Sequence, residues 1–131
     1  KPPTSGDHWS APAQCGFYTT QVNDEALVHN LEHGQVVLSY HLPDETDTDR
    51  LRETHRNLQG SSNWLITRHY PDLPKGNIAL AAWGVLDKFD GIDEQRIEQF
   101  FETYKGNLFS DETRGLGQGI PCTNVTTTMA K

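Results

Sequence analysis

Residues 23–42 read NDEALVHNLEHGQVVLSYHL, and this stretch decides the fold. Asn23 and Asp24 are good N-cap residues, apolar side chains then recur at helical spacing, and Gly34 is typical of the position just after a helix. The following QVVLSYHL is rich in β-branched and aromatic residues and stops at Pro43. The stretch therefore predicts a helix of about three turns followed directly by a buried strand.

The rest of the chain carries similar patterns around this unit. We expect an irregular loop over residues 1–22, a polar turn over 43–49 and a helix from Thr48 or Asp49 to about Leu58. Strands are expected over 63–70 and 77–87, with a bulge or a close backbone approach at Gly84, and a last helix should begin at Asp93 and stop at Gly106. This order pairs a parallel βαβ crossover with a hairpin, so we predict an α/β two-layer sandwich with a small mixed sheet. The order resembles the thioredoxin-like one with its first strand missing.

Length and charge limit the domain count and the classes of function. For 131 residues we expect one domain over 1–131, made of an N-terminal loop over 1–22 that carries His8, an α/β core over 23–105 and an irregular tail over 106–131. Eleven Lys and Arg against eighteen Asp and Glu give a net charge of −7, and no basic run occurs. Nucleic acids and anionic membrane surfaces both select clustered positive charge, so neither is expected as a partner.

The start of the chain and its cysteines bear on the compartment. The sequence begins at Lys1 rather than Met and holds no run of roughly 20 apolar residues, as expected of a mature fragment whose signal peptide or membrane anchor has been removed. Cys15 and Cys122 lack CxxC spacing, which excludes a thioredoxin-type redox motif and a four-thiolate zinc site. They form either one disulfide, in an oxidising compartment, or two unpaired thiols.

Six histidines beside a single Met make a metal site the first functional hypothesis. His29 and His33 stand four apart in HNLEH, so both imidazoles lie on one face of the predicted helix and can reach one metal ion. The alternative is two polar side chains on the solvated face of a helix, near its C-terminus. His8 lies in PPTSGDHW, a Pro- and Gly-punctuated segment whose stiffness suits a ligand presented from outside the helix.

The segments PPTSGDH (2–8) and LVHNLEHG (27–34), followed by VVLSY and by ALAAWG, resemble a family of secreted or membrane-anchored bacterial domains of unknown function. The resemblance runs from about residue 2 to residue 105, and VHNLEHG is its specific part. It implies that His8, His29 and His33 match the family's signature histidines and that the setting is extracytoplasmic. The usual form of the first segment is PPTSGPH, so Asp7 is a departure, either a partner for a histidine or a tolerated change.

Three neutral imidazoles suit a copper ion or a zinc ion, whereas calcium and magnesium prefer oxygen ligands. For an extracytoplasmic binding module we favour copper, with Met129 as a soft fourth ligand if the tail folds back. The predicted function is metal capture, delivery or storage without covalent catalysis. The expected partners are the metal ion and a protein that donates or accepts it.

Two alternatives belong to other classes. HNLEH also satisfies H-x-x-E-H, in which two histidines bind zinc and Glu32 would activate water, with Glu98 or Glu102 as the third ligand. Against this zinc hydrolase, Gly34 ends the helix at once, the chain is short for a substrate cleft, and His8 has no role. The other alternative is a metal-free structural or interaction module, in which the signature histidines hydrogen-bond the N-terminal loop to the helix.

The remaining histidines are expected to be surface or edge residues. His41 ends a strand, His55 lies on a helix among charged neighbours, and His69 is followed by Tyr70 and a proline. Strand alternation would allow His69 to face the same end of the sheet as the helix that carries His29.

Overall fold

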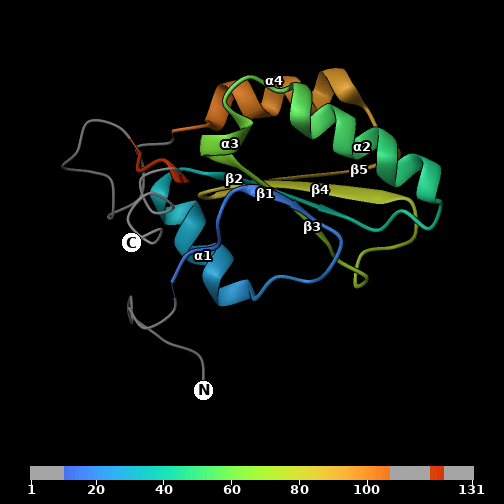
Figure 1. The fold of residues 1–131 in the computed structure, drawn as a ribbon, viewed down its shortest axis with the longest axis horizontal. Helices are drawn as coiled ribbons and strands as arrows, with labels where there is room; N and C mark the ends of the chain where they lie inside the picture. The colour runs from blue at the N-terminus through green and yellow to red at the C-terminus, as the bar shows by residue number, and fades with distance from the viewer. Residues whose placement is uncertain (1–10, 107–118, 123–131) are drawn as a thin grey trace.

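The computed structural model describes residues 11–106 and 119–122. These residues form five strands in one sheet, in the order β1-β3-β2-β4-β5, and four helices (Figure 1). In chain order the elements are β1 (Gly16–Tyr18), α1 (Asp24–His33), β2 (Val36–Tyr40), α2 (Glu45–Asn57), α3 (Ser61–Trp64), β3 (Leu65–His69), β4 (Asn77–Ala82), β5 (Val85–Asp90) and α4 (Glu94–Tyr104). No helix in this described part is long and apolar enough to cross a membrane.

The central strand is β2, as its composition predicts. All five residues of VVLSY are buried, as expected of a strand that has neighbours on both sides and packed layers on both faces. β2 runs parallel to β3, with Tyr40 opposite His69, and antiparallel to β4, with Leu38 opposite Leu80. The β2–α2–β3 unit is the predicted parallel crossover.

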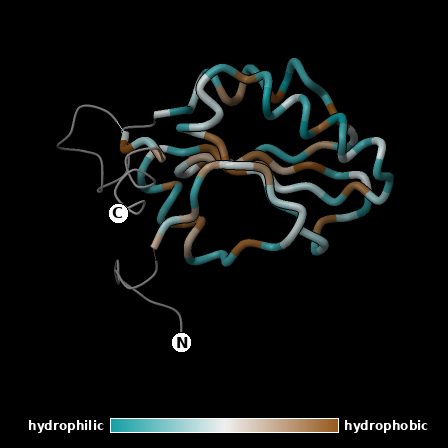
Figure 2. Tube along the Cα trace, in the orientation of Figure 1, coloured by the Kyte–Doolittle hydropathy of each residue, from teal (hydrophilic) through white to brown (hydrophobic). Residues whose placement is uncertain are grey.

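The helices pack on both faces of the sheet, but unequally. α2, α3 and α4 cover one face, and α1 lies against the other (Figure 1). The larger core lies between the sheet and the first group of helices and includes Leu51, Ile97 and Phe101. Figure 2 shows hydrophobic residues concentrated along the central strands. The predicted α/β sandwich with a mixed sheet is therefore confirmed.

One strand was not predicted from the sequence, and one helix begins earlier than predicted. Residues 16–18 form the edge strand β1, parallel to β3, inside the segment predicted as a loop, so the strand missing from the predicted order is present. α2 begins at Glu45 rather than after Thr48. The Asp44 side chain accepts the N–H of Thr46 at 2.9 Å, and the first turn is acidic, which the helix dipole favours. The stretch predicted as an acidic turn is therefore the start of a helix.

The hairpin lies later in the chain than predicted. β4 and β5 pair antiparallel with Ala82 opposite Val85, where one strand over 77–87 was expected. Gly84 adopts a φ of 77° and serves the two-residue turn between them rather than a bulge. β4 pairs with β2 and not with β3, and residues 61–64, partly predicted as strand, form the helical turn α3.

Candidate metal site

The end of α1 positions two histidines. Asn23 caps the start of the helix, accepting the N–H of Glu25 at 2.7 Å. The helix ends at Gly34, whose φ of 98° lies in the left-handed region that glycine adopts most readily. His33 is thus the last residue of α1, and its C=O accepts the N–H of Ile120 at 2.8 Å. Because the last carbonyls of a helix carry partial negative charge, this end favours a cation.

His29 and His33 lie side by side on α1. Their ring centres are 4.5 Å apart, with an angle of 71° between the ring planes. His33 is 7% exposed and His29 is half-buried. With metal–nitrogen bonds of about 2.0–2.1 Å, the centres of two imidazoles on one ion lie at most about 6.4 Å apart. The structure therefore brings these two predicted ligands within the range that a shared ion requires.

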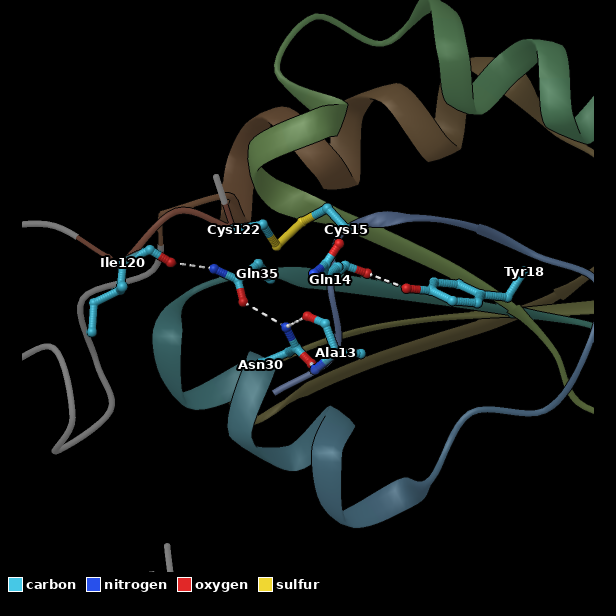
Figure 3. Close-up of a disulfide and its surroundings, with 8 residues drawn as sticks. All are labelled: Ala13, Gln14, Cys15, Tyr18, Asn30, Gln35, Ile120 and Cys122. Atoms are coloured by element: carbon cyan, nitrogen blue, oxygen red, sulfur yellow. Dashed lines mark hydrogen bonds between the residues drawn. A yellow bond between two sulfur atoms is a disulfide. The ribbon is translucent and has the colours of Figure 1, made fainter. Parts of the chain in front are cut away.

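Two buried amides beside the histidines hold segments from both ends of the chain. The Asn30 side chain accepts the N–H of Ala13 and donates to its C=O, each at 2.8 Å, and it donates to Oε1 of Gln35 at 2.8 Å (Figure 3). The amide nitrogen of Gln35 donates to the C=O of Ile120. Asn30 and Gln35 are almost completely buried. We call this network, formed by Ala13, Asn30, Gln35 and Ile120, the amide clamp.

A disulfide joins the two segments that the amide clamp holds. Cys15 and Cys122 are bonded across 107 positions of sequence, with their Cα atoms 5.7 Å apart (Figure 3). Cys122 is buried against Leu27 of α1 and against Val37 and Ile66 of the sheet. Of the two possibilities that the sequence left open, the disulfide is the one present.

The match to a known protein family covers nearly all of the segments described above. The family described as "Protein of unknown function (DUF3105)" matches residues 1–119. The chain belongs to this family. No curated protein matches the chain, and no solved structure matches it. The family match includes His8, His29 and His33 and both amides of the clamp, while the family description names no activity, so function has to be argued from the chemistry of the site.

Two predicted ligands lie outside the described residues. His8, with its neighbour Asp7, precedes residue 11, and Met129 follows residue 122. The described part of the N-terminal segment reaches α1 through Ala13, which is bonded to Asn30, the residue next to His29. The chain therefore enters the fold beside the histidine pair.

The hydrolase alternative gains no third ligand from the described residues. Glu102 pairs with Lys105 at 2.9 Å. Glu98 lines a groove with Arg50 between α2 and α4, on the face of the sheet opposite α1 (Figure 1). Within residues 11–106 and 119–122, no group of three or more His, Cys, Asp or Glu side chains is arranged to hold a metal ion.

His55 is not the surface residue that was predicted. It is 8% exposed, its Nδ1 lies 2.7 Å from Oγ1 of Thr67, and its ring meets the Phe17 ring edge-on with centres 6.0 Å apart. His55 follows Leu51 by four positions, so both side chains lie on the inward face of α2. Burial lowers the pKa of His55 to about 4, so this ring is neutral at physiological pH.

His41 and His69 lie together, away from the α1 pair. Their ring centres are 5.8 Å apart at the end where β2 and β3 finish. His33 precedes the start of β2, whereas His69 lies opposite Tyr40, the last residue of β2. His69 therefore lies at the other end of the sheet from the α1 histidines, although strand alternation had allowed the same end.

The two buried amides that organise the site were not predicted from the sequence. Asn30 lies three positions after Leu27, on the buried stripe of α1, and a polar residue on an apolar stripe is a signal that could have found it. Gln35 opens a run of buried strand residues and offers a weaker signal of the same kind. For Gly119 no local pattern exists: an added Cβ would lie 2.5 Å from the His33 carbonyl oxygen, a constraint set by residues far away in sequence.

Proposed function

We propose that this chain is an extracytoplasmic domain that binds a copper ion, with zinc as the second choice, for metal capture, delivery or storage. His29 and His33 would supply two imidazole ligands from α1, and His8 would supply a third from the N-terminal segment. The observation that carries the proposal is the 4.5 Å separation of the His29 and His33 ring centres at the C-terminal end of the helix.

The anchoring of the N-terminal segment at Ala13 supports the proposal that His8 is the third ligand. Ala13 is tied to Asn30 by two hydrogen bonds of 2.8 Å, and Asn30 adjoins His29. His8 precedes Ala13 by five positions, and five extended residues span at most about 18 Å. His8 is therefore within reach of the His29–His33 pair, and the Cys15–Cys122 disulfide further fixes where this segment leaves the fold.

Charge and donor chemistry support a transition metal. Neutral imidazole nitrogens suit copper and zinc, whereas magnesium and calcium select oxygen donors. The carbonyl end of α1 and the net charge of −7 both favour a cation at this place.

The disulfide supports an extracytoplasmic location. Disulfides form and persist in oxidising environments such as the periplasm or the extracellular space, and they are rare in the cytosol. The Cys15–Cys122 bond closes nearly the whole described chain, which suits a protein that folds outside the cytoplasm.

The proposal is tested by titrating tag-free protein with Cu(I), Cu(II) and Zn(II) against chromophoric chelators of known affinity. We expect one tightly bound ion per chain. The double variant His29→Gln/His33→Gln should bind that ion more than about a hundredfold more weakly, and His8→Gln should weaken it at least about tenfold. His69→Gln is the matched control and should leave the tight site unchanged. Tight binding that survives the double variant would overturn the proposal.

The amide clamp favours a second candidate, a metal-free structural or interaction module. Asn30 and Gln35 already tie the N-terminal segment and residues 119–122 to the end of α1 without any metal. Metal analysis separates the two candidates. A tag-free protein that takes up no metal, together with a double His29→Gln/His33→Gln variant that loses stability, would establish the second one.

A further inference from the structure

His41 and His69 form a second pair of histidines, at the opposite end of β2 from the α1 pair. His69 is the last residue of β3, and His41 directly follows β2. Since β2 and β3 are parallel, with Tyr40 opposite His69, both rings lie at the carboxyl edge of the sheet. Their centres are 5.8 Å apart, and the ring planes are nearly perpendicular, at 82°. Both residues are half-buried.

The hydrogen bond of His41 fixes which nitrogen can bind a cation. Nδ1 of His41 lies 2.7 Å from the C=O of Leu73, and a carbonyl oxygen only accepts, so Nδ1 carries the hydrogen. In the neutral ring Nε2 then holds the lone pair. Histidines that bind metals commonly donate their other ring N–H to a backbone carbonyl in this way, which fixes the tautomer and the ring orientation.

The surrounding backbone holds this pair in place. The N–H of His41 donates to the C=O of Asn77 at 3.1 Å, and the C=O of His41 accepts the N–H of Gly76 at 2.6 Å. The ring of His69 packs against the Tyr40 ring, with centres 5.6 Å apart. A site whose donors are already oriented needs little ordering when an ion binds.

We propose that His41 and His69 form a second metal site, which binds a divalent ion that prefers imidazole, such as Cu(II), Ni(II) or Zn(II). The 5.8 Å separation lies within the limit of about 6.4 Å for two imidazoles on one ion. The described residues offer no third His, Cys, Asp or Glu donor here, so water would complete the coordination and the ion would exchange readily.

The second site is independent of the first. β2 separates the two histidine pairs, and its five residues span about 17 Å at the usual rise of a strand. Figure 1 shows α1 ending at one end of the sheet and α2 beginning, just after His41, at the other. One ion cannot bridge that distance, so the His41–His69 site does not rest on the function proposed for the α1 pair.

The test is calorimetric titration of Zn(II) and Ni(II) into the full chain and into the His29→Gln/His33→Gln variant, which removes the other pair. In both proteins we expect a weaker class of one ion per chain. His41→Gln alone and His69→Gln alone should each weaken this class by more than about tenfold, because each removes one of two ligands. The buried-histidine variant His55→Asn serves as the control and should retain it.

A second measurement uses the His29→Gln/His33→Gln variant, in which the tighter site is removed. Substoichiometric Cu(II) added to this isotope-labelled variant should broaden the ring resonances of His41 and His69 together, and more than those of His55. The proposal is overturned if neither ring is broadened. It is equally overturned if the weaker class is absent, or if it survives either single substitution at full affinity.

Discussion

At the scale of single residues, α1 divides its polar side chains between two roles. Asn30 points to the buried side and bonds Ala13 and Gln35, whereas His29 and His33 face each other one turn apart. The four-residue spacing made the histidine pair predictable, because helical geometry alone sets that contact. The role of Asn30 was not predictable from spacing, because its partners come from segments whose placement depends on the whole fold.

Asn30→Ala should lower the free energy of unfolding by about 2–3 kcal/mol, because it leaves the buried Gln35 amide and the half-buried N–H and C=O of Ala13 without their Asn30 partner. Urea unfolding followed by circular dichroism measures this. Asn57→Ala, at an exposed position at the end of α2, is the control and should change stability by less than about 0.5 kcal/mol. An Asn30 variant as stable as this control would show that the amide clamp does not hold the two segments.

Metal affinity at the α1 pair should fall as pH falls, because protonated imidazole cannot bind a metal and binding must displace the proton. Histidine has an ordinary pKa of about 6.5, so the apparent Kd for copper or zinc should rise steeply between about pH 7.5 and pH 5. Competition titrations across this range measure it. A flat affinity profile would mean that the ligands are not histidines.

At the scale of elements, predictability followed the length of the local pattern. β2 was predicted because a run of β-branched and aromatic residues that stops at a proline marks a buried strand, and α4 because a long apolar stripe with an N-cap marks a helix. β1 is three residues long and carries too little pattern to be seen. The start of α2 was misplaced because the acidic stretch before it offers several possible caps, of which Asp44 is the one used.

The pairing of the strands illustrates a different limit. The hairpin was placed between 63–70 and 77–87, whereas β4 in fact joins β2 and forms its hairpin with β5. Local periodicity identifies a strand but not its neighbour, because pairing is decided by packing between residues that are distant in sequence. The same limit explains why His69 was not predicted to meet His41.

His55 makes α2 sensitive to acid. The unfolded chain protonates this imidazole with an ordinary pKa of about 6.5, and the folded chain only near a pKa of about 4, so the unfolded state binds more protons between these values. The stability from neutral His55 is complete above about pH 6.5 and is lost as pH falls toward 4.

Between pH 7 and pH 4 the unfolding free energy of the wild type should fall by about 3 kcal/mol more than that of His55→Asn, in which Asn can keep a bond to Thr67 without titrating. Urea unfolding at a series of pH values gives the difference. His69→Asn is the control and should retain the wild-type slope. Equal slopes for the wild type and His55→Asn would mean that His55 is not held neutral in the folded protein.

At the scale of the whole molecule, the two ends of the chain are fastened at one place. The disulfide and the amide clamp both tie residues near 13–15 to residues 119–122, next to the end of α1. The sequence could show that two cysteines lie near opposite ends, but not that they meet, because their approach depends on the complete sheet. This fastening holds Ala13 against Asn30, the residue next to His29.

The double variant Cys15→Ala/Cys122→Ala should lose about 2–5 kcal/mol of stability, because the bond closes a long loop in the unfolded chain. Denaturant unfolding with and without a reducing agent measures this effect. Reduction of the wild type should reproduce the variant, and the reductant should leave the variant itself unchanged. If the unfolding midpoint of the wild type is the same with and without the reducing agent, the structural role of the disulfide is contradicted.

The central claim is that histidine imidazoles from α1 and the N-terminal segment hold one metal ion. The most direct measurement is X-ray absorption at the copper edge, on protein loaded with less than one ion per chain so that only the tight site fills. We predict scattering from three imidazole rings in the wild type and from fewer in the His29→Gln/His33→Gln variant, where any remaining copper would be held by His8 alone or by the His41–His69 pair. A tightly bound copper ion whose spectrum shows no imidazole ring, or the same rings in the variant, would contradict the account.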